Sequence, residues 1–465
     1  MPQLRLAAKM NRSARIPFES RVMDWARRVA PLSNLYRRLP SSLRERVARF
    51  SNDRLSSQLK FDRTSAWQLP DLTTEATLDG KLATSVQNDT PGINVFGYLR
   101  GQFGLGESAR QYAQALIGAG VDVALVDLDL DLPHGWQDGT LEALLGKQAP
   151  HAVSLLFVNP DYLDAALERI GSDRLRGRRL IACWFWELDR IPEAWMPSLE
   201  RIDELMVSSA FIEEAFRAVT DKPIFRVPLP LSPQPDSALQ RRDFGLQEDA
   251  FLFLTSFDFN SWIARKNPYA VIEAFTRAFP VGTEPVRLLL KTSNGFRYPG
   301  PLRELLAATA VDPRVMVRDD IIERAHMTAL HRCSDAYVSL HRAEGFGLGM
   351  AEAMAAGKPV IATDWSGNLD FMSADVACMV RYRLVAVESD QYPHASGAYW
   401  AEPDVDSAAA AMRRLAEDRD AAARLGARAR THVLETLHPG AAAAALVGHL
   451  QALQMKPPRR SIPDA

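Results

Sequence analysis

A glycine-rich segment with two glutamates carries the clearest chemistry in the sequence. The run SLHRAEGFGLGMAEAM, residues 339–354, places Glu344 in a loop and Glu352 in the first turns of the helix that follows. Ligands of parallel α/β sheets bind beyond the carboxyl ends of the strands, and free N–H groups at a helix N-terminus attract a diphosphate. The two carboxylates can therefore contact different parts of one extended ligand.

Basic residues supply a second candidate group. Arg265 and Lys266, in FDFNSWIARKNP, follow the first strand of the second half of the chain. Positive charge is unfavourable at the start of a helix, so this position indicates that an anion binds here. The simpler alternative is a pair of solvated side chains. Lys291 ends a strand that we expect to be buried and is a third basic candidate.

Two further turns have suitable residues but a less specific pattern. Ser366, Gly367 and Asn368 follow a strand, so their backbone N–H groups can bind phosphate, or Ser366 or Asn368 serves only as a helix cap. Gly104 and Gly106, in GQFGLGE, join the first strand to its helix. This turn differs from the dinucleotide-binding fingerprint because no third glycine follows at the expected spacing.

Strands and helices alternate along most of the chain, which predicts parallel sheets covered by helices on both faces. Four prolines within 227–235 exclude a helix there and indicate a linker between two α/β units. The strands expected in the first unit are 93–98, 121–128, 152–158, 180–186 and 204–208, with a helix at 107–118. The second unit has expected strands at 251–256, 286–291, 315–318, 336–341 and 359–363 and helices at 267–279, 301–309, 325–333, 348–356 and 368–372. Three alanine-rich helices, 407–417, 420–434 and 439–454, follow.

The composition fits a two-domain globular enzyme. The 465 residues carry a net charge of -2, which gives no general basic field for nucleic acid. The three cysteines lie far apart, so neither a disulfide framework nor a metal-type spacing is expected, and a reducing compartment fits best. We found neither a secretory signal nor an apolar run long enough to span a membrane. These features predict a cytoplasmic protein.

Positive charge is concentrated at the start of the chain. Residues 1–63 contain 15 Lys and Arg against 5 Asp and Glu. The segment 21–49 indicates one or two basic helices, which either pack on the rest of the protein or dock on anionic lipid headgroups. The second alternative predicts a peripheral location on the inner face of the cytoplasmic membrane.

The run from Glu344 to Glu352, continued by AGKPVIAT, resembles the Glu-x7-Glu signature of the family 4 (group 1) retaining glycosyltransferases, over roughly residues 92–455. The resemblance implies a GT-B fold, with two Rossmann-like domains facing a cleft. It also implies transfer of a sugar from a nucleotide donor to a saccharide or lipid-linked saccharide acceptor, in the polysaccharide-synthesis branch of the family. No metal and no other cofactor is expected. Rival hypotheses are a GT-B epimerase or phosphorylase and a non-catalytic GT-B partner subunit.

The resemblance also assigns roles to residues. It implies that Glu344 contacts the donor sugar and Glu352 the donor ribose, and that Lys266 meets the leaving diphosphate. Arg265 would replace the separate upstream arginine of the family, which this sequence lacks. Further donor contacts would come from Gly345, Phe346 and Gly347, and the turn of Gly104 and Gly106 would border the cleft.

The expected domains are a basic extension and linker (1–90), an acceptor domain (91–230), a donor domain (231–438) and a disordered tail (456–465), with a helix at 439–455 able to pack back on the acceptor domain.

Some other residues have a simpler explanation than chemistry. Asp127, Asp129 and Asp131 resemble the metal-binding Asp-x-Asp of the other glycosyltransferase fold, but they lie in a chain patterned as GT-B. His151 and His341 are isolated histidines, which are more often structural. The aromatic segment 184–186 ends a strand that faces the expected cleft, so its rings either stack on an acceptor sugar or pack in the core.

Overall fold

The computed structural model describes residues 69, 91–130, 132, 138–232 and 237–454. The basic segment 1–63, Asp131 and the tail 456–465 lie outside these residues, so the membrane-docking hypothesis stays a prediction. Among the described residues, no helix combines the length and the apolar character that a membrane crossing requires.

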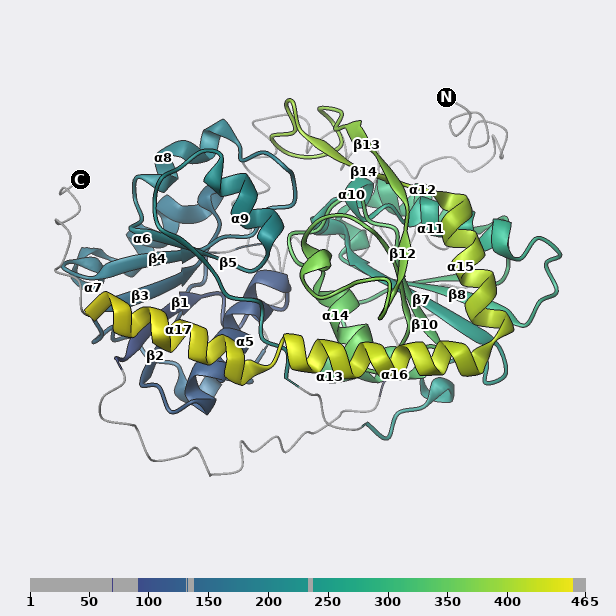
Figure 1. Ribbon diagram of the computed structural model, residues 1–465, viewed down its shortest axis with the longest axis horizontal. Helices are drawn as coiled ribbons and strands as arrows, with labels where there is room; N and C mark the ends of the chain where they lie inside the picture. Colours follow the sequence, from purple (N-terminus) through teal and green to yellow (C-terminus); the bar gives the residue numbers. More distant parts are fainter. Residues whose placement is uncertain (1–68, 70–90, 131, 133–137, 233–236, 455–465) are drawn as a thin grey trace.

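Two parallel six-stranded sheets form the core of the molecule (Figure 1). In spatial order the first sheet contains β2 (Val123–Asp127), β1 (Ile93–Gly97), β3 (Val153–Phe157), β4 (Arg179–Cys183), β5 (Glu204–Val207) and β6 (Ile224–Arg226). The second contains β12 (Cys378–Val380), β11 (Val360–Thr363), β10 (Ala336–Ser339), β7 (Phe251–Asp258), β8 (Val286–Ser293) and β9 (Val315–Asp319). Their near-continuous apolar sequences fit strands that are covered on both faces.

The strand order places one switch point in each sheet. In the first sheet β2 and β3 lie on opposite sides of β1, and in the second β8 and β10 lie on opposite sides of β7. Consecutive crossovers diverge at such a point and leave a crevice at the carboxyl ends of the strands. The loops after β1 and β3, and those after β7 and β10, are therefore the expected ligand-binding loops.

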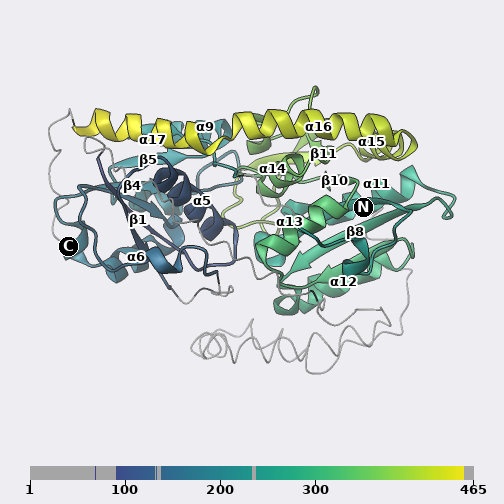
Figure 2. The ribbon, with the colours of Figure 1, turned by 90° about the horizontal axis from the view of Figure 1, so that it is seen from below.

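Helices cover the sheets and link the two halves (Figures 1 and 2). The helices that matter here are α5 (Gly104–Gly118), α6 (Leu163–Ile170), α9 (Ala210–Arg217), α10 (Ile263–Lys266), α11 (Pro268–Ala278), α12 (Pro299–Thr309), α13 (Arg324–Cys333), α14 (Leu348–Ala355), α15 (Val405–Glu417), α16 (Arg419–Thr436) and α17 (Pro439–Gln454). Helix α16 packs on α14 of the second half, whereas α17 packs on α5 of the first. The last two helices therefore hold both halves together, with one hydrophobic cluster extending across them.

Three differences from the sequence prediction affect the site. Helix α5 begins at Gly104, inside the glycine-rich turn, rather than at residue 107. The predicted helix at 368–372 is a single 3-10 turn at Gly367–Asp370. The antiparallel hairpin of β13 (Tyr382–Ala386) and β14 (Tyr399–Pro403) was not predicted.

This hairpin projects from the second half and reaches the first (Figure 1). Its connecting loop and β14 bury Val387, Tyr392, Ala398 and Trp400 in the hydrophobic cluster of the first half.

Candidate active site

The loops at the second switch point bring the predicted carboxylates and cations to one place. Strand β7 leads through a 3-10 turn into α10, which ends with Arg265 and Lys266, and β10 leads into the loop that carries Glu344. Together with α14 they surround a cavity of about 260 Å³. Its walls include Gly104, Lys266, Lys291, Glu344, Gly347 and Glu352.

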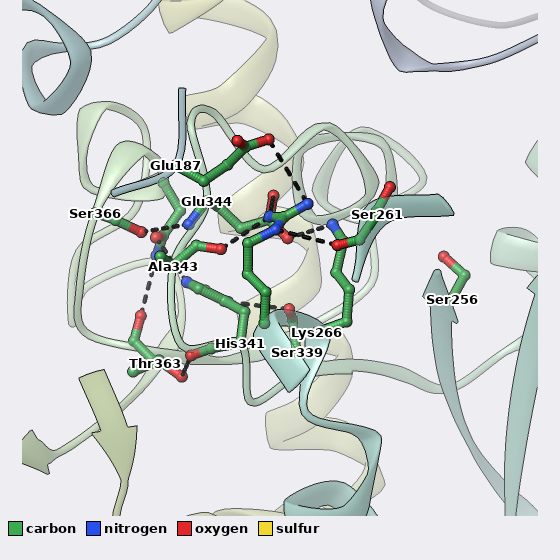
Figure 3. Close-up of polar contacts among 12 residues, drawn as sticks. Glu187, Ser256, Ser261, Lys266, Ser339, His341, Ala343, Glu344, Thr363 and Ser366 are labelled. Atoms are coloured by element: carbon green, nitrogen blue, oxygen red, sulfur yellow. Dashed lines mark hydrogen bonds and ion pairs between the residues drawn. The ribbon is translucent and has the colours of Figure 1, made fainter. Parts of the chain in front are cut away.

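Glu344 lies in a cationic cluster (Figure 3). One carboxylate oxygen pairs with Lys266 Nζ, and the other lies 2.9 Å from Arg265 Nη1. Burial alone would raise the pKa of Glu344, but the two cations outweigh it and hold that pKa well below its usual range. Glu344 is therefore a permanently charged carboxylate at neutral pH.

Arg265 and Lys266 are neighbours in sequence with different surroundings. Arg265 is 3 % exposed and donates to the carbonyl oxygens of Ser261 and Ala343, and its guanidinium also lies 3.7 Å from Glu187 of the first half. Lys266 lines the cavity and has Glu344 as its polar partner there. Burial lowers the pKa of Lys266, while Glu344 opposes that shift. Lys266 is thus the cation of the pair that faces the cavity.

Glu352 occupies another part of the cavity with a single arginine beside it. Its carboxylate lies 3.6 Å from Arg324 Nη2 and 4.0 Å from His331 Nε2. Burial raises the pKa of Glu352, and Arg324 only partly offsets that effect. Arg324 also pairs with Glu107 of α5 and so joins the two halves. Sequence reasoning missed Arg324, for which the only signal was its position at a helix start.

The loop after β11 supports the Glu344 loop from outside the cavity. The backbone N–H of Glu344 donates to Ser366 Oγ at 2.9 Å, and the N–H of Gly367 donates to the carbonyl oxygen of Glu344 at 2.9 Å. Asn368 Oδ1 accepts a hydrogen bond from His341 Nε2 at 3.1 Å, and Asn368 Nδ2 donates to the carbonyl oxygen of Thr363 at 3.1 Å. A Cβ on Gly367 would collide with the Gly345 carbonyl. These contacts position Glu344.

The remaining predicted residues also have packing partners. Phe346 is 4 % exposed and packs against Phe371. Gly345 lies against the backbone of Trp186, where a Cβ would come 2.8 Å from its carbonyl oxygen. A Cβ on Gly106 would come 2.5 Å from the carbonyl oxygen of Gly101. These residues shape the loops, whereas Gly104 and Gly347 lie on the cavity wall.

Lys291 and His341 are also fixed in place. Lys291 lines the cavity and donates to the carbonyl oxygen of Asp320 at 2.8 Å, and burial lowers its pKa. His341 is fully buried, shares a hydrogen bond with Ser339 Oγ at 3.0 Å, and has a pKa that burial lowers. Its surroundings support the structural explanation expected from sequence.

The aromatic segment after β4 packs in the core. Trp184 and Trp186 are 0 % and 4 % exposed, and both rings pack against Trp195. Of the two alternatives, core packing therefore holds for these tryptophans. Within the described ranges, no three His, Cys, Asp or Glu side chains come together in a way that could hold a metal ion.

Comparisons with known proteins agree with this geometry. Residues 215–446 match the family model described as "Family 4 Glycosyltransferase in conflict systems". The comparison with curated proteins finds no match to this chain.

Solved structures share the whole fold at low sequence identity. A glycosyltransferase from Rickettsia africae ESF-5 aligns with a TM-score of 0.57 and 12% identity over 79% of this chain and 100% of its own. Sucrose-phosphate synthase from Thermosynechococcus elongatus gives 0.56 and 15% over 78% and 99%. HepE from Anabaena, in complex with UDP and glucose, gives 0.54 and 13% over 78% and 100%. The predicted fold class, two Rossmann-like domains in the GT-B arrangement, is confirmed.

Proposed function

We propose that this family 4-like glycosyltransferase of the GT-B fold transfers a hexose from a UDP-sugar to a saccharide or lipid-linked saccharide. The proposed transfer retains the anomeric configuration. The single observation that carries the proposal is the cavity at the second switch point, which Lys266, Glu344 and Glu352 line together. UDP as the carrier is suggested by HepE from Anabaena, which is described in complex with UDP-glucose. We place the product in surface polysaccharide synthesis.

The proposed reaction breaks the bond between the anomeric carbon and the diphosphate while the acceptor oxygen attacks the same face of the sugar. Negative charge then grows on the leaving diphosphate, and the acceptor proton passes to a phosphate oxygen. Lys266 and the N-terminus of α14 lie where they can stabilise this charge. Because Arg265 also pairs with Glu344, the carboxylate keeps a cation when Lys266 turns to the diphosphate.

The proposal assigns the two glutamates to different parts of the donor. Glu352 accepts hydrogen bonds from the ribose hydroxyls, and Glu344 accepts them from the sugar. Donor binding therefore requires both residues, whereas binding of free UDP requires mainly Glu352. Their separate positions around one cavity support this division.

The function is tested with the full-length protein and three nucleotide classes. We expect UDP to raise the melting temperature more than GDP or dTDP, since a ligand stabilises the state that binds it. The protein should then release UDP from a UDP-hexose, slowly with water and faster with a saccharide acceptor, and NMR of the product should show the donor's anomeric configuration. Lys266→Ala is the matched inactive control.

Three results would each contradict a part of the proposal. An epimerised donor without transfer would favour the epimerase hypothesis. Absence of both nucleotide binding and donor cleavage would favour a non-catalytic subunit. Inversion at the anomeric carbon would contradict retention while leaving the transferase activity in place.

A further inference from the structure

Three separate segments meet next to the Glu344 cluster. Tyr392, in the loop of the β13–β14 hairpin, donates a hydrogen bond to Glu187 Oε2 at 2.6 Å, and its ring lies 6.0 Å from the Arg265 guanidinium. The ring of Trp262, which directly precedes α10, lies 6.0 Å from the ring of Tyr392. The hairpin, the first half of the molecule and the segment that leads to Lys266 therefore adjoin one another here.

Two residues of this region have an unusual backbone. Trp262 has φ 63° and His394 has φ 54°. A positive φ is unfavourable for a bulky residue and persists where the surrounding structure enforces it, which happens often at ligand-binding sites. Both rings nevertheless remain available, because Trp262 is 43% exposed and the His394 side chain 37%. The fold holds two rings at the surface in conformations that local preference disfavours.

The first half contributes a carboxylate from its own switch point. Asp161 follows β3, lies 3.6 Å from His394 Nε2 and accepts a hydrogen bond from Trp195 Nε1 at 3.2 Å. Tyr162, the next residue, is 45% exposed. Since ligands of parallel sheets bind at this point, the position of Asp161 and Tyr162 is independent evidence for a binding site.

Buried rings beneath this surface make it rigid. The ring of Trp186 lies 5.6 Å from that of Tyr392 and 6.5 Å from that of His394, and it packs edge-on against Trp195. The tryptophans that sequence analysis considered as sugar contacts thus support the exposed residues from behind. A preorganised surface loses little side-chain entropy when a ligand binds.

These residues match the chemistry of a pyranose ring. A pyranose has an apolar C–H face, which stacks on an aromatic ring, and hydroxyl groups that both donate and accept hydrogen bonds. Trp262 and Tyr162 offer aromatic faces, and Asp161 and His394 offer hydrogen-bonding groups. A lipid chain would make no hydrogen bonds with the exposed carboxylate and imidazole and would cover them at a cost in free energy, whereas sugar hydroxyls can bond to both, so the residues favour a sugar.

We propose that Trp262, Tyr162, Asp161 and His394 form the acceptor-sugar site, which binds a neutral hexopyranose beside the donor sugar on Glu344. This inference rests on the proposed transferase function. It adds the chemical class of the acceptor group and the residues that select it. Two of these residues lie outside the first half, His394 in the hairpin loop and Trp262 directly before α10.

The site is tested by binding rather than by turnover. The probes are the methyl glycosides of glucose, galactose and mannose, titrated by saturation-transfer NMR against the full-length protein saturated with UDP. We expect ring-face protons of at least one glycoside to receive saturation, and Trp262→Ala to weaken that glycoside about 10-fold, the loss expected for one aromatic stacking partner. Asp161→Asn should weaken the same glycoside without removing a ring. UDP affinity should stay unchanged in both variants.

Tyr399→Ala is the matched control, since Tyr399 is an aromatic residue of the same hairpin with 46% exposure and no part in the site. Retained glycoside binding in this control supports the proposal. Equal binding by wild type, Trp262→Ala and Asp161→Asn overturns it, and so does the failure of all three glycosides to bind. Unchanged UDP binding in those cases shows that the donor function stands, whereas loss of UDP binding by the wild type would contradict the proposed function itself.

Discussion

Glu344 and Glu352 belong to one motif, yet the molecule surrounds them differently. Glu344 has two cations, Arg265 and Lys266, which hold its pKa well below the usual range. Glu352 has one, Arg324, which does not overcome the rise in its pKa caused by burial. One carboxylate is therefore locked in its charged form, and the other can still take up a proton.

The difference fits the separate tasks that we propose for the two residues. The charge on the leaving diphosphate grows during the reaction near the Glu344 cluster. The fixed charges of this cluster can therefore stabilise the transition state more than the ground state. Beside Glu352 the ribose is neutral before and after transfer, and hydrogen-bond acceptance is sufficient. The comparison teaches that sequence spacing places the two glutamates on one cavity, while their neighbours determine their chemistry.

The largest expected effect comes from removing the cation that faces the cavity at Glu344. We predict that Lys266→Ala lowers kcat by roughly 10²- to 10³-fold, the range for losing one preorganised electrostatic donor. UDP binding should also weaken. Stopped assays with a UDP-hexose, together with calorimetry for UDP, measure both effects.

Lys291→Ala is the comparison variant, because Lys291 lines the same cavity but donates to Asp320. A kcat loss in Lys291→Ala larger than that in Lys266→Ala would transfer the leaving-group role to Lys291.

A smaller effect should separate the two glutamates directly. We predict that Glu352→Gln weakens UDP and the UDP-sugar alike by roughly 10- to 100-fold, because a hydrogen bond to a charged group contributes about 1.5–3 kcal/mol. Glu344→Ala should lower kcat/KM for the sugar donor and leave UDP affinity nearly unchanged. Calorimetric titration of both variants with UDP measures this difference in affinity. Equal loss of UDP affinity in the two variants would show that the glutamates share one task.

The cavity residues could be found from sequence because their signals are local. A strand, a glycine-rich turn and a helix start predicted the place of Glu344 and Glu352, and a basic residue at a helix start indicated Lys266. The family resemblance assigned different roles to Arg265 and Lys266, but the local pattern could not show that only Lys266 lines the cavity, since adjacent residues on a short helical turn point in different directions.

The hairpin β13–β14 and Arg324 could not be predicted for another reason. Tyr392 and Trp400 belong to the hydrophobic cluster of the first half, and Tyr392 bonds to Glu187, 205 residues away in sequence, so no local pattern marks them as buried. Arg324 likewise pairs with Glu107 across the two halves.

The turn of Ser366, Gly367 and Asn368 shows that a local sequence pattern can also suggest a role that the observed contacts do not favour. Their sequence suits phosphate binding by backbone N–H groups, whereas their contacts here support the Glu344 loop.

The smallest predicted effect is a pH dependence that arises at Glu352 alone. The ribose hydroxyls donate to the carboxylate, so they favour its deprotonated form. UDP affinity should therefore be constant above the raised pKa of Glu352 and fall as the pH drops through it, in total by no more than the loss predicted for Glu352→Gln, because the protonated carboxyl and the amide both lack the charge. Glu344, whose pKa is lowered, stays charged over the same range, and its stabilising ion pairs are lost only at pH values below the ordinary glutamate pKa. Affinity should thus decline before the protein unfolds.

Calorimetry between pH 5 and 8, with circular dichroism to follow folding, measures this difference (about three pH units suffice for one titration). The phosphate of UDP also takes up a proton near pH 6, so Glu352→Gln serves as the reference that retains the phosphate titration and lacks the carboxylate. Identical pH profiles for wild type and Glu352→Gln would show that Glu352 does not titrate in this range, and the contrast with Glu344 would then rest on position alone.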